Sequence, residues 1–159
     1  MAIIKIGSNG LDTGVGGKVL QTVQGTTTTT TAQTSVTWSD TTLSASITPS
    51  STSNKILVLV NQFVQIFRAS IYYAGGSLRL VRDSTTVYAG DLGYQYYYQI
   101  NSATGMNTYD YKSLSYLDSP STTSSTTYKT QQRSADAADT ITTQQGSTKS
   151  TIILMEIAG

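Results

Sequence analysis

The sequence predicts an all-β protein, an antiparallel β-sandwich or jelly roll of about eight to ten strands. The first observation is that 28 of the 159 residues are Thr and 21 are Ser, and that the branched Cβ of Thr suits a strand. The second is that 12% of the residues are charged, against roughly 25% in an ordinary soluble domain. The 11 Tyr argue against disorder, because disordered chains are poor in aromatic residues. The third is a series of short apolar segments separated by turn residues.

The organisation predicted along the chain is a Gly-rich N-terminal arm over residues 1–17, followed by one globular domain over residues 18–159. An arm that anchors the domain to a neighbour would use its apolar side chains. The candidate anchoring residues are Ile3, Ile4, Ile6 and Leu11.

The first half of the domain predicts four strands. Residues 19–24 alternate, and the Thr run after them is either a flexible connector or an exposed edge. Residues 34–38 predict a short strand, and residues 43–47 have the period of a strand with one buried face. Residues 55–67 are the strongest signal. Their first half is apolar on both faces, which predicts a central strand.

The second half continues the pattern. Gly75 and Gly76 predict a turn, and Asp83 with Ser84 predicts the turn of a hairpin. The final segment is strongly apolar, so we expect it to be internal. The strands predicted in this half cover residues 77–82, 85–89, 112–117, 126–132, 140–143 and 150–157.

The composition also excludes several classes of function. The chain has no Cys and no His, which excludes disulfide scaffolds, thiol catalysis, histidine metal sites and the Ser-His-Asp triad. A net charge of +1 does not indicate a nucleic-acid or membrane partner. Residues 1–10 lack the apolar core of a signal peptide, so we expect synthesis in a cytoplasm.

The most distinctive segment is a Tyr-rich stretch between residues 90 and 110. Tyrosine offers a flat ring and a hydroxyl at low entropic cost, which suits a sugar or protein surface. The alternative is packing within a sheet or between subunits, because Tyr is enriched at interfaces. The candidate ligand or subunit-contact residues are Tyr94, Tyr96, Tyr97, Tyr98, Gln95, Gln99 and Asp91.

The acidic residues predict neither a metal site nor an active site. The Asp residues lack the close spacing of a calcium loop, and turn capping is the expected role of Asp83, Asp91, Asp110 and Asp118. A glycosidase needs two facing carboxylates, and the chain has one Glu. We therefore predict a non-enzymatic protein without cofactor or metal. Arg68, Arg79 and Arg82 are expected to pair with Asp83 or Asp91, or to bind an anionic sugar.

Several segments resemble the small C-terminal domains of fibre-like proteins of tailed bacteriophages, common in marine phages. The most specific are Leu117-Asp118-Ser119-Pro120 and Leu154-Met155-Glu156-Ile157. The matching stretches, in order, are residues 17–21, 47–58, 80–86, 117–123, 128–129 and 150–157.

This resemblance implies a trimeric jelly roll of the complement-head and tumour-necrosis-factor-like kind, placed on the outside of a virion. Such domains usually end a long fibre, whereas about 17 residues precede the domain here. Two hypotheses follow: a fibre or tail tip that attaches to a host glycan or protein, and a capsid decoration protein that stabilises the head. A polysaccharide hydrolase is a distant third. The expected partners are further copies of the chain, and other virion proteins through the arm.

Overall fold

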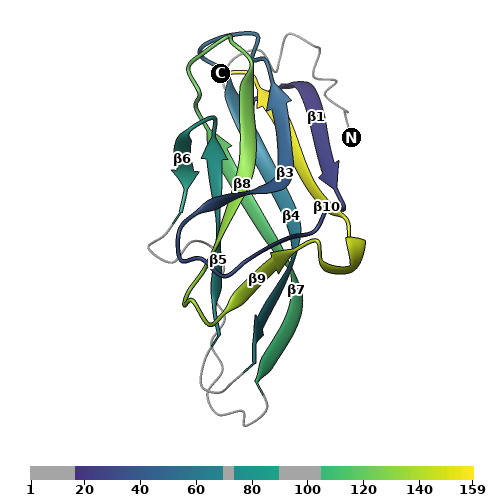
Figure 1. The fold of residues 1–159 in the computed structure, drawn as a ribbon. Coiled ribbons are helices and arrows are strands. Elements are labelled where there is room, and N and C mark those ends of the chain that lie inside the picture. Colours follow the sequence, from purple (N-terminus) through teal and green to yellow (C-terminus); the bar gives the residue numbers. More distant parts are fainter. Residues whose placement is uncertain (1–16, 70–73, 90–104) are drawn as a thin grey trace, which may run out of the picture.

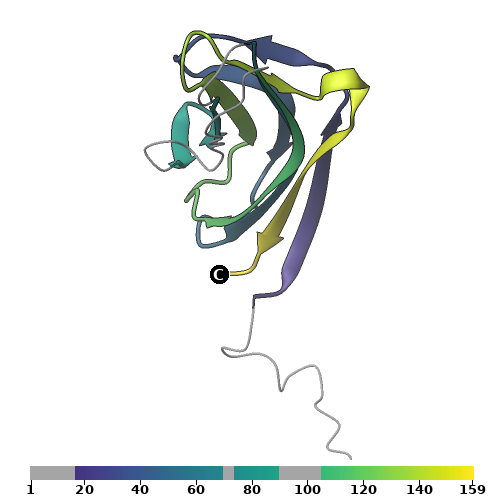
Figure 2. The same ribbon diagram turned by 90° about the horizontal axis from the view of Figure 1, so that it is seen from below.

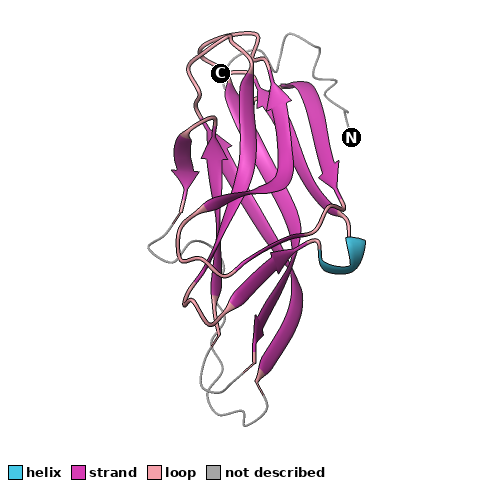
Figure 3. Cartoon of the chain, in the orientation of Figure 1, coloured by secondary structure: helices cyan, strands magenta, loops and turns pink. Residues whose placement is uncertain are grey.

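The computed structural model describes residues 17–69, 74–89 and 105–159, and within these ranges the chain forms two antiparallel β-sheets packed face to face (Figures 1 and 3). The predicted all-β class and antiparallel sandwich are therefore confirmed. The one helical segment in the described ranges is a single 3-10 turn, η2 (Gln145–Ser147). No helix there is long and apolar enough to cross a membrane.

The larger sheet is built around β4 (Lys55–Arg68), the longest of the described strands. One side of β4 pairs along its whole length with β7 (Met106–Asp118). The other side pairs first with β10 (Ser150–Ile157) and then with β9 (Thr140–Thr143). The sheet ends at β1 (Val19–Thr27), which pairs with β10, and at β2 (Thr31–Gln33), which pairs with β9.

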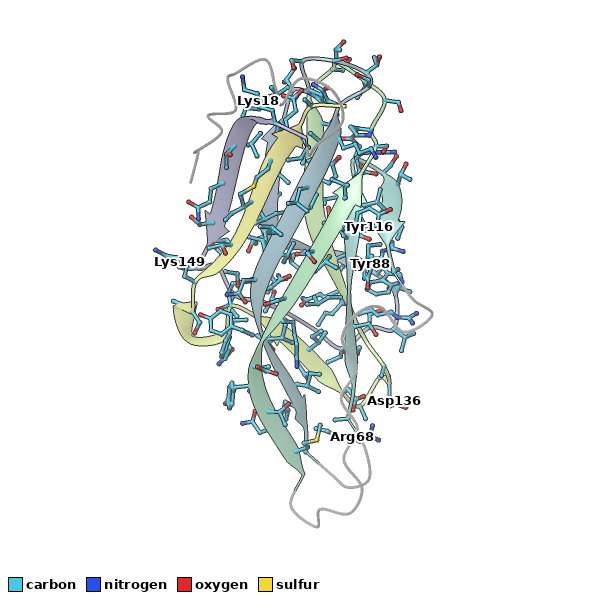
Figure 4. The ribbon with its side chains drawn as sticks, turned by 180° about the vertical axis from the view of Figure 1, so that it is seen from behind. Lys18, Arg68, Tyr88, Tyr116, Asp136 and Lys149 are labelled. Atoms are coloured by element: carbon cyan, nitrogen blue, oxygen red, sulfur yellow. The ribbon has the colours of Figure 1, made fainter. Side chains whose placement is uncertain are left out.

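The smaller sheet has the order β3-β8-β5-β6. These strands are β3 (Ser39–Ile47), β8 (Thr126–Ser134), β5 (Gly76–Arg82) and β6 (Thr85–Tyr88). Seen from below, the strands of both sheets enclose the core between them (Figure 2). Tyr88 of β6 and Tyr116 of β7 meet across the sandwich with ring centroids 5.6 Å apart (Figure 4).

Most predicted strands are confirmed, including the central one and the internal C-terminal one. The strand predicted at residues 34–38 is wrong. There the Ser35 hydroxyl accepts a hydrogen bond from the Thr37 backbone N–H at 3.1 Å, which bends the chain locally. The predicted Gly75-Gly76 turn is also wrong at Gly76. This residue begins β5, where a Cβ would crowd the Ile141 side chain.

The core contains two separate hydrophobic clusters. The first includes Ile56, Val58 and Val60 of β4, and the second includes Val64 and Ile66 of the same strand. Since the inward-facing positions of a strand alternate, Gln62 occupies the inward position between them. The two clusters are thus separated by a polar side chain that is 0% exposed.

Around Gln62 lies a buried group of polar side chains, here called the polar layer. Its members come from β3, β4, β8, β10 and the residue after β9. They are Thr41, Gln62, Thr130, Gln132, Gln144 and Ser150. Thr41 Oγ1 lies 2.6 Å from Thr130 Oγ1 and accepts a hydrogen bond from Gln62 Nε2 at 3.2 Å. These contacts connect the two sheets through directional bonds rather than through apolar packing.

Candidate functional site

The candidate residues predicted from the sequence fall on segments that lie outside the described residues. This holds for the arm residues Ile3, Ile4, Ile6 and Leu11, and for the Tyr-rich stretch with Tyr94, Tyr96, Tyr97, Tyr98, Gln95, Gln99 and Asp91. The described part of the chain carries two other surfaces with chemical character, one on the outer face of each sheet.

The outer face of the larger sheet combines apolar side chains from four strands with uncharged polar ones such as Gln24, Asn61 and Ser115. Thr22, Met155, Leu57 and Leu117 are direct neighbours in the register of β1, β10, β4 and β7. The side chain of Leu117 is 49% exposed. The alternation that buries Ile56 and Val58 against the smaller sheet turns their neighbours outward. We call this surface the apolar face. Its apolar members are Leu20, Leu57, Leu59, Leu117, Ile153, Met155 and Ile157.

An aromatic cluster continues the apolar face beyond β10. The ring of Phe63 stacks on that of Tyr109 with centroids 6.2 Å apart, and meets Tyr111 edge-on at 5.2 Å. Gln65 and Asn107 each donate a hydrogen bond to the Tyr109 hydroxyl. These contacts hold Tyr109 in place although it is 54% exposed. Tyr109 belongs to the Tyr-rich stretch of the sequence, so part of that signal does fall on the described surface.

Charge is nearly absent from the outer face of the larger sheet. Among the outward positions of β1, β4, β7 and β10, Lys55 at the start of β4 is the one charged residue. Lys18 and Lys149 precede β1 and β10 and mark opposite ends of this antiparallel strand pair (Figure 4). A surface with exposed apolar side chains and almost no charge is typical of a protein contact.

The outer face of the smaller sheet has the opposite character. The guanidinium carbons of Arg79 and Arg133 lie 4.6 and 4.8 Å from the ring centroid of Trp38. Trp38 directly precedes β3, whereas Arg79 is on β5 and Arg133 on β8, so three elements converge here. We call these three residues the Trp-Arg cluster. Partial burial and the nearby charge of Arg133 lower the pKa of Arg79.

An ion pair borders the Trp-Arg cluster. Asp40 accepts hydrogen bonds from Lys129 at 2.7 Å and from Gln131 at 2.6 Å, one on each carboxylate oxygen. Burial opposes ionisation of Asp40, but these two bonds outweigh it and lower its pKa. Gln131 also accepts a bond from Arg79 Nε at 2.7 Å. Gln131 therefore orients Arg79 and Asp40 at the same time.

The three buried carboxylates of the described ranges each have structural partners. Asp118 accepts hydrogen bonds from Arg82 and Tyr128, both at 2.7 Å. Asp139 accepts from Arg68 at 2.9 Å and from the backbone of Gly75. Glu156 is held by neutral donors, the nearest being the side chains of Asn54 and Gln21 and the backbone N–H of Ser50, all at 2.6 Å.

These contacts correct the predicted pairing of the arginines with Asp83, while Asp91, the other predicted partner, lies outside the described residues. Arg82 pairs with Asp118 rather than with its neighbour Asp83, and Arg68 pairs with Asp139 and Asp136 (Figure 4). Asp83 instead accepts a hydrogen bond from the Thr127 backbone at 2.9 Å, so it connects the turn between β5 and β6 to β8 rather than capping its own turn. In the part of the chain that the structure describes, no three His, Cys, Asp or Glu residues gather as metal ligands would.

The sequence carries only a weak signal for the Trp-Arg cluster. Arg79 is a candidate residue for binding an anionic sugar, but Trp38 and Arg133 are far from it along the chain. Only the strand order brings them together, because β8 lies between β3 and β5. The alternation of β8, which points Lys129, Gln131 and Arg133 to one face, is the one hint that the sequence carries.

The fold and its two surfaces define an antiparallel β-sandwich with one apolar outer face and one charged outer face. No family model matches the chain, and no curated protein matches it. A structure of infectious bursal disease virus, Gt strain, is 14% identical over 89% of this chain, with a TM-score of 0.34. A structure of T=1 particles derived from infectious bursal virus is 16% identical over 89% of this chain, also with a TM-score of 0.34. This chain spans 39% and 37% of those two viral chains, and at this similarity neither identifies its function.

Proposed function

We propose that this chain is a non-enzymatic structural subunit on the outside of a tailed-bacteriophage particle, where it forms a homotrimeric jelly-roll tip that attaches to a host surface. The observation that carries the self-association is the apolar face. Met155, Leu57 and Leu117 lie side by side on it, with Lys55 as its one charged residue. The virion location is supported by the sequence resemblance to phage fibre tips.

Self-association removes the apolar face from water. A contact between copies there meets almost no like-charge repulsion, because the outward positions of four strands carry a single cation. Burying apolar area stabilises a complex by about 25 cal/mol per Å² before the entropic cost of association. The charged face of the smaller sheet stays outside such a contact, available to a ligand.

The oligomer is tested by putting a charge into the apolar face. Leu59 is half-buried on the outward side of β4, next to Ile153 of β10. We expect the wild-type chain to sediment as a trimer and Leu59→Lys to sediment as a monomer with unchanged far-UV circular dichroism. Ser44→Lys, an exposed position of β3 on the other sheet, is the matched control and keeps the trimer. A monomeric wild-type chain at 100 micromolar concentration, roughly the range of weak complexes, contradicts the proposal.

The position on the particle is tested by labelling intact virions with an antibody against this chain and viewing them by electron microscopy. Label at the tail end is the expected result. Label spread over the head identifies a capsid decoration protein instead. Deleting residues 2–16 then separates the contribution of the arm, because a decoration subunit anchored by its arm is released and the particles lose resistance to heat. Unlabelled virions overturn the virion role altogether.

A further inference from the structure

We propose that the Trp-Arg cluster binds the oxyanion groups of an acidic polysaccharide. The proposal deepens the attachment role given above and rests on it for its biological setting. The cluster lies on the smaller sheet, whereas the apolar face lies on the larger one, so both surfaces can be engaged in the same subunit.

The first argument is the placement of two cations on one ring. Arg79 and Arg133 both lie within 5 Å of the centroid of Trp38. In addition to partial burial, the charge of Arg133 is close enough to contribute to the lowered pKa of Arg79. An oxyanion near both guanidinium groups is attracted to both charges. Planar guanidinium groups also match carboxylate and sulfate oxygens with paired hydrogen bonds.

The second argument is the donor capacity that Arg79 keeps. Its Nε donates to Gln131, which fixes the orientation of the group. No described residue accepts a hydrogen bond from its two terminal nitrogens. Asp40, the nearby carboxylate, has both oxygens occupied by Lys129 and Gln131. The terminal nitrogens of Arg79 are therefore oriented, half-buried and able to donate to a ligand.

The third argument is rigidity. Arg79 and Gln131 are directly opposed in the β5-β8 register, and Arg133 follows two residues later on the same face of β8. Side chains held on paired strands are ordered before a ligand arrives, which lowers the entropic cost of binding. Trp38 adds an apolar ring beside the cations, a combination that suits a sugar ring carrying an acidic group.

A polysaccharide fits this cluster better than a nucleic acid does. Nucleic-acid binding without sequence preference needs a basic stripe that follows many phosphates. The chain carries a net charge of +1, and the Trp-Arg cluster is a single compact spot bordered by the Asp40–Lys129 pair. Binding to DNA is therefore an outcome that would contradict the proposal.

The test measures retention of the full-length chain on immobilised polymers at fixed salt. Polygalacturonate presents carboxylates, dextran sulfate presents sulfates, plain dextran is neutral, and double-stranded DNA presents phosphates. We expect binding to at least one of the two acidic polysaccharides, and the one that binds identifies the oxyanion. Plain dextran is not retained. Failure of both acidic polymers, or equally tight binding to DNA, overturns the inference.

Three variants distinguish binding at the Trp-Arg cluster from non-specific attraction between the protein and a charged polymer. Arg79→Gln loses about tenfold or more in affinity, as expected for a lost charge-assisted bond. Arg79→Lys keeps the charge but loses the paired geometry, so it too binds more weakly than the wild type. Lys149→Gln, at an exposed position just before β10 of the other sheet, makes the same charge change and keeps full affinity. An equal loss in Lys149→Gln overturns the site. Thermal unfolding of each variant verifies that it is folded.

The polymer test and the virion labelling fail independently. If the variants behave as expected but virions are not labelled, the anion site holds and the attachment role is wrong. If virions are labelled at the tail but neither acidic polymer is bound, the attachment role stands and the Trp-Arg cluster is not its ligand site.

Discussion

Asn54 and Glu156 are joined by a hydrogen bond of 2.6 Å from Asn54 Nδ2 to Glu156 Oε1, and both side chains are buried. Gln21 donates to the other carboxylate oxygen at 2.6 Å, and Ser50 donates through its backbone N–H and its hydroxyl. Burial alone would raise the pKa of Glu156, but these donors outweigh it and lower the pKa to about 2. A buried anion is thus stabilised by neutral groups.

Glu156 makes the stability of the protein depend on pH in the acid range. Its pKa is lowered in the folded state, so the unfolded chain binds the proton more readily. The stabilisation is complete above the ordinary carboxyl pKa of about 4.5 and is lost as pH falls from there towards 2. We expect a loss on the order of 2 kcal/mol over this interval, measured by urea unfolding at a series of pH values.

The control for this prediction is Glu156→Gln, which cannot titrate. This variant is less stable than the wild type at pH 7, because the amide cannot accept from all the donors around it. Its stability should change less than that of the wild type between about pH 4.5 and about pH 2, the interval in which the carboxyl of Glu156 titrates in the wild type. Equal pH slopes in the two proteins would assign the acid sensitivity to another carboxylate.

The contacts of Asp118 predict a second large loss of folding stability. Asp118 is 7% exposed and accepts from both Arg82 and Tyr128. Burial and the adjacent carboxylate raise the pKa of Tyr128 above its ordinary value, so the hydroxyl remains a donor. Asp118→Asn leaves Arg82 without its counter-ion and should cost about 3 kcal/mol in the free energy of unfolding. Tyr128→Phe, which removes one neutral donor, should cost about 1 kcal/mol.

Gly25 predicts a steric effect at one edge of the sandwich. A Cβ at this position would overlap the carbonyl oxygen of Ser44 on β3. Gly25→Ala should therefore push β1 away from β3 and destabilise the fold by about 1–3 kcal/mol, as measured by chemical unfolding. Thr26→Ala, the exposed next residue of β1, is the control and should change stability by about 0.5 kcal/mol or less.

The polar layer predicts opposite effects at two bonded residues. Gln62 Oε1 is buried and accepts no hydrogen bond from the described residues, so Gln62→Leu removes an unsatisfied acceptor. We expect that variant to be neutral or more stable, by up to about 1 kcal/mol. Thr41→Val should be destabilising by about 1 kcal/mol, because it leaves Thr130 and Gln62 without their shared partner. Equal losses in both variants would show that shape, not hydrogen bonding, dominates this layer.

The sequence predicted the strands well where alternation is strict. Leu43, Ala45 and Ile47 are buried as their spacing indicates, and the apolar first half of β4 lies between β7 and β10. The failure at residues 34–38 came from Ser35, whose side chain bonds the backbone and competes with a strand. Local hydrogen bonding of this kind is weakly visible in a pattern of apolar positions.

The two outer surfaces were harder to predict from the sequence than the strands were. Apolar residues on both faces of β4 correctly predicted a central strand, but they did not indicate that Leu57 and Met155 would form part of an outer surface. The partners of Glu156 are far from it along the chain, and nothing local distinguishes Asn54 from any other turn residue. Contacts between distant residues depend on strand order, which alternation does not determine.

The polar layer also fixes how the two sheets sit on each other. Apolar packing is non-directional and tolerates sliding of one sheet over the other by a fraction of a residue. A hydrogen bond has a preferred length and angle, so the bond from Gln62 of β4 to Thr41 of β3 is broken by such a slip. This hydrogen bond therefore fixes the position of one sheet relative to the other. If one sheet is held by neighbouring subunits and a ligand pulls on the other, the bond resists sliding between the two sheets.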